Sequence, residues 1–135
     1  MSTRSRQALD PSIRRLVRAI NAFPGAETIG SCGGHPNPVD GQWPEGSWYV
    51  NIVFDRSEAG HFALEFLAWA INNDYRRGGY RVMLYPYAPP PYLNQPGQVL
   101  RYHLEGYDTS ADELAAFLNK VRRKGFISPE KAVRL

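Results

Sequence analysis

Apolar side chains recur at helical spacing in three stretches of the chain. These stretches cover residues 10–22, about 57 to about 73, and 110–125. Within each of them the apolar positions fall three or four residues apart, which lines one side of a helix with apolar groups. The pattern predicts three amphipathic helices, each with one side buried.

Short polar residues mark the starts of these helices. Asp10 stands before Pro11, a proline at the first helical position, so we expect Asp10 to cap the first helix. Asp55 or Ser57 is expected to cap the second helix, and Ser110 opens a capping box for the third. Glycines follow each helix and predict where it ends.

Four other stretches predict β-strands, over residues 26–31, 47–54, 80–86 and 98–104. The strand over 47–54 has the clearest signal, because β-branched and aromatic residues alternate along it. One of its faces would carry Trp48, Val50, Ile52 and Phe54, and the other Tyr49, Asn51 and Val53.

The resulting order, α-β-β-α-β-β-α, predicts an α+β fold. We expect a two-layer sandwich of about three helices on a four-stranded, mostly antiparallel sheet. The β-α-β passage between residues 48 and 86 could add one parallel pair through a right-handed crossover. A single domain is expected over residues 1–135, with a flexible arm at 1–8, a tail at 126–135 and a stiff proline-rich connector at 88–97.

Composition and charge limit the compartment and the partners that we expect for this domain. A chain of 135 residues can bury a stable hydrophobic core without disulfides or structural metal ions. It has no apolar run of about 18 residues, so we expect no membrane partner. It has no secretory leader pattern, and its single cysteine cannot form an internal disulfide, so we expect a cytoplasmic protein. The net charge of +3 mildly favours anionic partners, although much of the excess lies near the chain ends.

The glycine-rich stretch at residues 31–35 is the first candidate for a site. It consists of Ser31, Cys32, Gly33, Gly34 and His35. Backbone N–H groups around the two glycines could form an anion-binding nest. The stretch is neither a P-loop nor a dinucleotide-binding fingerprint, because the lysine of the first and the glycine spacing of the second are missing.

Cys32 and His35 admit three interpretations. They could be two ligands of a metal site completed by His61 and His103. They could form a thiolate–imidazole nucleophile pair. They could also be a buried thiol beside a tight turn with a hydrogen-bonded histidine, and we assign no metal ligand and no catalytic residue on this evidence.

Aromatic and basic side chains interleave along the second half of the chain. Aromatic rings stack on bases and arginines pair with phosphates, so this mixture suits the binding of a nucleotide or of single-stranded nucleic acid. Alternatively, the tyrosines are strand formers and the arginines are charges on a sheet edge. The full set of candidate ligand-binding residues is Ser31, Cys32, Gly33, Gly34, His35, Trp43, Tyr49, Arg101, Tyr102 and His103.

The stretch from Pro24 to His35 also carries two resemblances. Its pattern Pro-Gly-x-x-Thr-x-x-Ser-Cys-x-Gly-His resembles a stretch in small uncharacterised bacterial and phage proteins. More faintly, residues 10–54 are similar to the wybutosine-synthesis methyltransferase family, in which a helix and a strand precede a Ser-Cys-Ser-Gly-Arg motif; His35 stands at the position of that arginine. The second resemblance implies an α/β fold that uses S-adenosylmethionine on a modified guanine of transfer RNA.

These observations lead to one expected function and two alternatives. We expect a non-enzymatic binding protein, without a cofactor, for a small anionic ligand such as a nucleotide or a nucleotide-derived signal, of the kind that phage proteins sequester. The first alternative is an RNA-modifying enzyme resembling the methyltransferases above, with S-adenosylmethionine as cofactor. The second is a protein-interaction module or homo-oligomer whose proline-rich loop docks on a neighbour. A homo-oligomer is also expected for the binding protein, and RNA stays open as a partner.

Overall fold

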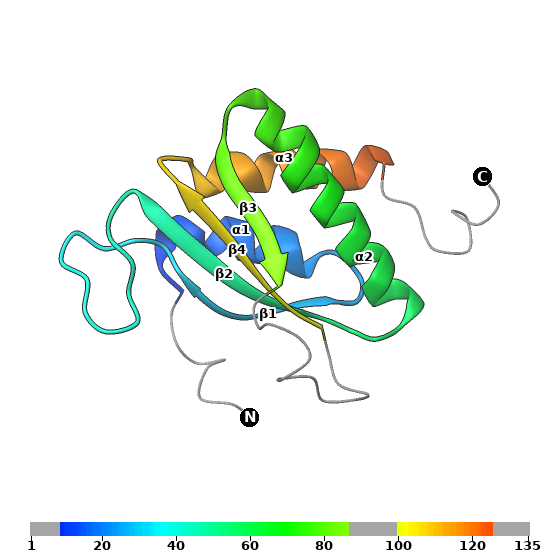
Figure 1. Ribbon diagram of the computed structural model, residues 1–135, viewed down its shortest axis with the longest axis horizontal. Coiled ribbons are helices and arrows are strands. Elements are labelled where there is room, and N and C mark those ends of the chain that lie inside the picture. The colour runs from blue at the N-terminus through cyan, green and yellow to red at the C-terminus, as the bar shows by residue number, and fades with distance from the viewer. Residues whose placement is uncertain (1–8, 87–99, 126–135) are drawn as a thin grey trace.

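The computed structural model describes residues 9–86 and 100–125 (Figure 1). The helices are α1 (Pro11–Asn21), α2 (Glu58–Trp69) and α3 (Ala111–Gly125), and the strands are β1 (Ala26–Cys32), β2 (Ser47–Phe54), β3 (Arg81–Pro86) and β4 (Leu100–Tyr107). This order confirms the predicted α+β fold. The expected arm at 1–8, the connector at 88–97 and the tail at 126–135 lie outside the described residues.

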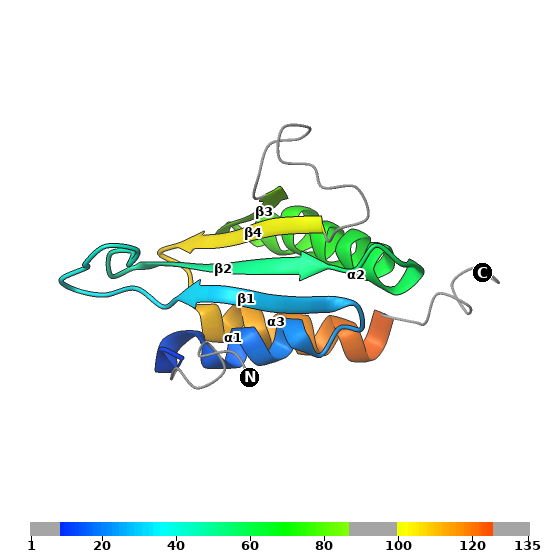
Figure 2. The ribbon, with the colours of Figure 1, turned by 90° about the horizontal axis from the view of Figure 1, so that it is seen from below.

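The four strands form one sheet in the order β1-β2-β4-β3 (Figure 2). All neighbouring strands are antiparallel. The parallel pair considered between residues 48 and 86 is therefore wrong. Strands β2 and β3 do run in the same direction on either side of α2, but β4 lies between them and pairs with both, which makes a split β-α-β arrangement.

All three helices pack against one face of the sheet. The core joins the inner sides of the helices to the even-numbered residues of the central strands. Its largest fully buried side chains are Ile13, Leu16, Ile20, Phe23, Val50, Ile52, Phe54, Leu67, Ile71, Leu104, Leu114 and Leu118. The opposite face, called the outer face below, carries the odd-numbered residues of β2, β3 and β4, and the candidate chemistry gathers there.

The register of β1 against β2 changes by one residue along the pair. Thr28 lies opposite Ile52, but Gly30 lies opposite Asn51, so a β-bulge falls between Thr28 and Gly30. Beyond the bulge Cys32 lies opposite Tyr49. Directly opposed residues of an antiparallel pair share a face of the sheet, so Cys32 belongs to the outer face.

The helix ends follow the prediction in part. The Ser57 hydroxyl accepts a hydrogen bond from the Gly60 N–H, and the Ser110 hydroxyl accepts one from the Glu113 N–H, so both act as caps. Asp10 is the N-cap residue of α1 and precedes Pro11, as predicted, but its side chain makes no capping hydrogen bond to the helix. Its carboxylate instead contacts the glycine-rich stretch 25 residues further along the chain.

The second helix extends further than predicted. A π-helical segment (Ala70–Tyr75) and a 3-10 turn (Arg76–Gly78) continue it beyond α2. The chain then leaves the helix at Gly79, whose φ of +91° is the left-handed conformation typical of a helix C-terminus. No helix of residues 9–86 and 100–125 has the length and apolar character that crossing a membrane requires.

Asparagine side chains cover both edges of the sheet. On the β3 edge, the Asn72 amide donates to the Leu84 carbonyl oxygen and accepts from the Leu84 N–H, each over 2.9 Å. On the β1 edge, the Thr28 N–H donates to the Asn21 amide oxygen over 2.9 Å. Such contacts occupy backbone groups that another strand could otherwise pair with.

Candidate functional site

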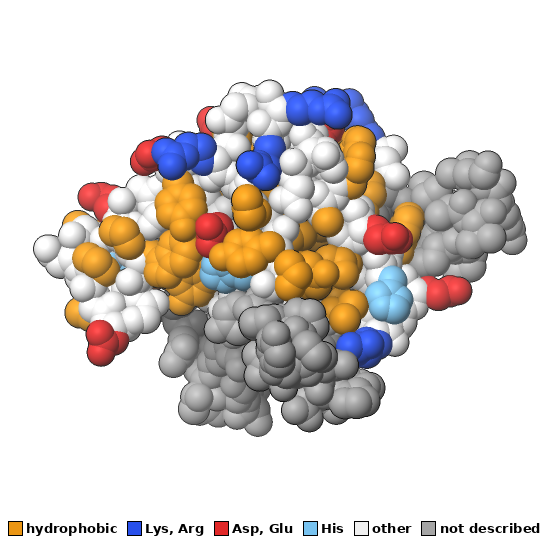
Figure 3. All heavy atoms as spheres, in the orientation of Figure 1, with side chains coloured by type: hydrophobic (Ala, Val, Ile, Leu, Met, Phe, Trp, Pro, Cys, Tyr) orange, Lys and Arg blue, Asp and Glu red, His pale blue; other side chains and the backbone are white. Residues whose placement is uncertain are grey.

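Trp43 lies at the centre of an aromatic cluster on the outer face. Its ring centroid lies 5.0 Å from that of Tyr49 and 5.7 Å from that of His103. It also stacks on Tyr107, with centroids 5.8 Å apart and ring planes inclined by 26°. Figure 3 shows hydrophobic side chains gathered in a band across one face of the molecule. The cluster places several aromatic rings together near the end of β4.

The loop that carries Trp43, residues 33–46, is fixed by backbone hydrogen bonds. The His35 N–H donates to the Trp43 carbonyl oxygen, and the Glu45 N–H donates to the His35 carbonyl oxygen, each over 2.9 Å. From β2, the Tyr49 hydroxyl donates to the Gly41 carbonyl oxygen over 3.1 Å. The indole is therefore held in place from both the backbone and the sheet.

An open cavity of about 380 Å³ lies beside the Trp43 and Tyr107 rings. Its volume falls within the roughly 300–1,000 Å³ that small-molecule sites occupy. The residues lining it are Trp43, Pro44, Glu45, Gly46, Ser47, Arg81, Tyr107 and Asp108. Arg81 is its basic group and lies 3.5 Å from the Asp108 carboxylate, with 69% of the arginine side chain exposed. The cavity thus combines aromatic walls, an accessible guanidinium and two carboxylates.

The backbone at the floor of this cavity has an uncommon conformation. Asp108 has a φ of +49°, the single positive φ among the described non-glycine residues. Its N–H donates to the carbonyl oxygen of Gly46, which itself has a φ of +91°. Aspartate tolerates the left-handed region better than most residues. Conformations of this kind occur more often at ligand sites than elsewhere.

His103 lies behind the aromatic cluster in a polar network. Its Nδ1 lies 2.7 Å from the Asn51 amide oxygen and its Nε2 lies 3.1 Å from Glu105. The Tyr85 hydroxyl donates to the same Glu105 oxygen over 2.7 Å. Burial lowers the pKa of His103 below its ordinary value, and the charge of Glu105 opposes this without reversing it. Both partner atoms are oxygens that accept hydrogen bonds, so a neutral imidazole can donate to only one of them.

The same network affects two tyrosines. Burial, together with the hydrogen bond to Glu105, raises the pKa of Tyr85 to about 12. Burial and Glu105 also raise the pKa of Tyr107. Both phenols are therefore protonated at neutral pH, and the Tyr107 ring can act as a neutral stacking surface.

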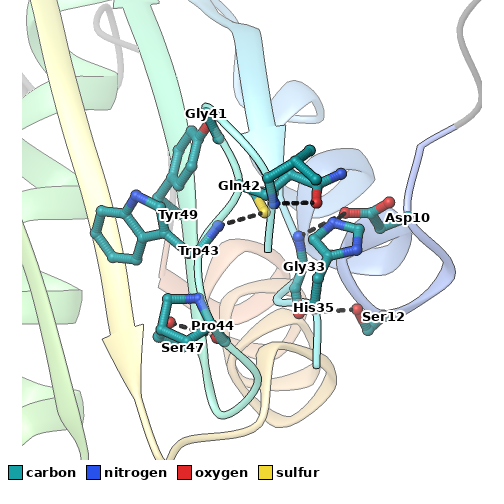
Figure 4. A network of polar contacts seen from close by, with 12 residues as sticks. Asp10, Ser12, Gly33, His35, Gly41, Gln42, Trp43, Pro44, Ser47 and Tyr49 are labelled. Atoms are coloured by element: carbon teal, nitrogen blue, oxygen red, sulfur yellow. Dashed lines mark hydrogen bonds and ion pairs between the residues drawn. The ribbon is translucent and has the colours of Figure 1, made fainter. Parts of the chain in front are cut away.

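Asp10 enters the glycine-rich stretch from the start of α1 (Figure 4). Its Oδ2 accepts a hydrogen bond from the Gly33 N–H over 2.8 Å and lies 3.1 Å from the His35 Nε2. The Ser12 hydroxyl donates to the Gly33 carbonyl oxygen over 3.1 Å. A carboxylate of the protein thus occupies one donor of the expected anion-binding nest, and the His35 N–H is used within the loop.

Cys32 lies beside this contact. Its sulfur accepts a hydrogen bond from the Trp43 N–H over 3.3 Å, and its side chain is buried. The sulfur, the Asp10 carboxylate and one His35 ring nitrogen all lie within 4.8 Å of one another. Cys32 and His35 therefore both contact the backbone of Trp43.

The structure brings together some of the predicted site residues and separates others. Tyr49, His103 and Trp43 form one cluster. Tyr102 lies on the helix-covered face, where its ring meets Phe54 edge-on. Arg101 lies six residues before Tyr107 in β4, about 20 Å along an extended strand.

The remaining predicted residues lie around the Asp10 contact. Ser31 lies opposite Val50 in the sheet and so shares its helix-covered face. Gly34, with a φ of +93°, turns the chain from β1 into the Trp43 loop. The set predicted from the sequence thus falls into two groups, the aromatic cluster and the surroundings of Cys32 and His35.

Several residues of these sites were not among those predicted, in particular Asp10, Glu45, Arg81, Tyr107 and Asp108. Arg81 stands in the basic and aromatic stretch and could have been chosen from it. Asp10 and Asp108 join the sites only through contacts between distant parts of the chain, which no local pattern signals.

Comparisons of the chain with protein-family models, with curated proteins and with solved structures found no match. The resemblances of the Pro24–His35 stretch therefore stay predictions. Function has to be argued from the geometry of the site.

Proposed function

We propose that the chain is a binding protein for a small anionic ligand with a planar ring, a nucleotide or a nucleotide-derived signal. The ligand occupies the cavity lined by Trp43, Tyr107 and Arg81. The observation that carries the proposal is that two stacked rings and an exposed guanidinium line the same cavity. These are the groups that recognise the base and the phosphate of a nucleotide.

Each part of such a ligand has a matching group. The base packs on the Trp43 and Tyr107 surface, since every base offers a π-face. The phosphate pairs with Arg81, whose guanidinium can bind two oxygens and whose present partner Asp108 is itself 80% exposed. Glu45 and Asp108 accept hydrogen bonds from ribose hydroxyls or from amino groups of the base.

A thermal-shift and calorimetry panel tests the proposal. The panel contains mononucleotides, cyclic dinucleotides, ADP-ribose and S-adenosylmethionine. At least one nucleotide should bind. Trp43→Ala should lower its affinity roughly 5- to 150-fold, the range for loss of one stacked base. Arg81→Ala should weaken it roughly tenfold or more, as expected for a lost charged hydrogen bond.

Two arginine variants serve as controls. Arg18→Ala removes an exposed arginine of α1 that does not line this cavity, and it should bind as the wild type does. Arg101→Ala should also bind normally; a loss there would move the site to the start of β4. Absence of binding across the panel, or unchanged binding in both Trp43→Ala and Arg81→Ala, would overturn the proposal. Binding of S-adenosylmethionine alone would favour the methyltransferase alternative.

A further inference from the structure

Three side chains of metal-ligating type converge at the start of the Trp43 loop. Asp10 comes from the residue before α1, Cys32 from the end of β1, and His35 from the loop itself. One donor atom of each lies within 4.8 Å of the other two. Sulfur, imidazole nitrogen and carboxylate oxygen are the three donor types that bind Zn²⁺ in proteins.

The spacing of these donors is close to that of a tetrahedral ion. Zn²⁺ bonds of about 2.0–2.3 Å hold their donors about 3.3–3.8 Å apart. The 3.1 Å contact between Asp10 Oδ2 and His35 Nε2 is already that short. The widest pair has to close by at most about 1.5 Å, which side-chain rotations can supply.

The same three residues do not have the arrangement of a nucleophile triad. In a triad the imidazole lies between the two other groups, so the nucleophile and the acid contact opposite ring nitrogens. Here the sulfur and the carboxylate oxygen are both within 4.8 Å of one ring nitrogen and of each other. Three donors around one point fit an ion rather than a proton relay.

Further hydrogen bonds orient two of the donors. The Trp43 N–H points at the Cys32 sulfur over 3.3 Å, and the Gly33 N–H points at Asp10 Oδ2 over 2.8 Å. Contacts of this second-shell type hold metal ligands in place in known sites. A Cβ at Gly33 would meet the Ser12 hydroxyl, so the Ser12 side chain would have to move for any other residue there.

We propose that Asp10, Cys32 and His35 bind one Zn²⁺ ion with a fourth position open to a water or a ligand. The side chains of His35 and Asp10 are 28% and 32% exposed, so the ion can enter from solvent, while Cys32 closes the site from the buried side. The ion takes the place of the proton between Asp10 and His35, and it binds the Cys32 sulfur as thiolate. Three protein ligands with an open position characterise zinc sites that act on a ligand.

Metal titration of the full chain tests this site with Zn²⁺ alone as the probe, so the result does not depend on nucleotide binding. Protein stripped with a chelator and reloaded should hold one Zn²⁺ per chain by mass spectrometry. Co²⁺ in its place should give the charge-transfer absorption of a cobalt–thiolate bond. Asp10→Asn and His35→Gln should each lower the Zn²⁺ affinity by about 100-fold or more, since even second-shell losses cost up to that much.

Matched variants make the result decisive. His61→Gln and Asp74→Asn alter exposed groups of α2 and of the π-helical segment that follows it, and both should bind Zn²⁺ as the wild type does. Cys32→Ser should abolish the cobalt–thiolate band, and circular dichroism checks that each variant folds. Asp10 and His35 are partly exposed, so their variants keep the test valid even if Cys32→Ser fails to fold. Less than one bound Zn²⁺ per wild-type chain, or affinities of Asp10→Asn and His35→Gln within twofold of the wild type, would overturn the site.

Discussion

The backbone N–H of Trp43 donates a hydrogen bond to the sulfur of Cys32 over 3.3 Å. This contact joins the residue that provides the stacking ring of the cavity to the residue that provides the thiol of the proposed zinc site. A thiolate bound to a cation is a stronger hydrogen-bond acceptor than a neutral thiol. We therefore expect Zn²⁺ binding at the proposed metal site to affect the proposed ligand cavity through this backbone amide.

Zn²⁺ should change the surroundings of the Trp43 indole. We expect addition of Zn²⁺ to alter the intrinsic fluorescence and to raise nucleotide affinity roughly fivefold, which corresponds to a coupling of about 1 kcal/mol. Trp43→Phe should lose the fluorescence change while it still binds Zn²⁺. Trp69→Phe, which alters an exposed indole on α2, should keep it. A fluorescence change that survives in Trp43→Phe would contradict this coupling.

Replacing Tyr75 by phenylalanine should stabilise the protein. The Tyr75 hydroxyl is buried without a hydrogen-bond partner in the described part of the chain, and burial raises its pKa to about 12. Removing an unsatisfied buried hydroxyl recovers about 1 kcal/mol. Tyr85→Phe is the matched comparison, because the Tyr85 hydroxyl does bond Glu105 and its loss should destabilise by about 1 kcal/mol. Urea denaturation measures the free energy of unfolding of both variants. A change of the same sign in Tyr75→Phe and Tyr85→Phe would contradict the prediction.

His103 should make the stability of the fold depend on pH. Its pKa in the folded chain lies below the value of about 6.5 that it takes when unfolded. As the pH falls below about 6.5, the unfolded chain takes up a proton at His103 that the folded chain does not. Protonation therefore favours the unfolded chain and lowers the free energy of unfolding. The free energy of unfolding should therefore fall more between pH 7 and pH 5 in the wild type than in His103→Gln. His61→Gln, at an exposed position of α2, should follow the wild type.

Asn72 should keep β3 from pairing with another chain. Asn72→Ala would leave the N–H and carbonyl oxygen of Leu84 without their present partner, at a cost of about 1–3 kcal/mol. It would also uncover a strand edge that invites self-association. Asn73→Ala, the exposed neighbour, is the control. Denaturation and size-exclusion chromatography should show a less stable, more associated Asn72 variant; identical behaviour of the two variants would be the contrary result.

Periodic patterns in the sequence were sufficient to predict most of the fold. The alternation over residues 47–54 correctly divided β2 between its two faces, and the spacing of apolar residues located all three helices. The order in which the strands pair could not be predicted from such patterns. That β4 pairs with β2 as well as with β3 depends on packing among distant segments, which no local spacing encodes.

The candidate sites were less predictable because they depend on long-range contacts. The Asp10–Pro11 pair is a valid helix-start pattern, yet the Asp10 carboxylate pairs with Gly33 and His35 instead of the helix. Burial of His103 could not be inferred from its place in a predicted strand. The end of β4 was placed at residue 104, which left Tyr107 out of the aromatic face.

The extra residue in β1 decides on which side of the sheet the chain's only thiol lies. With an unbroken register, Cys32 would oppose Trp48 rather than Tyr49 and would point among the helices. Asp10 and His35 would then have no sulfur beside them, and the Trp43 amide would lose its acceptor. The one-residue bulge between Thr28 and Gly30 is what makes the two sites neighbours.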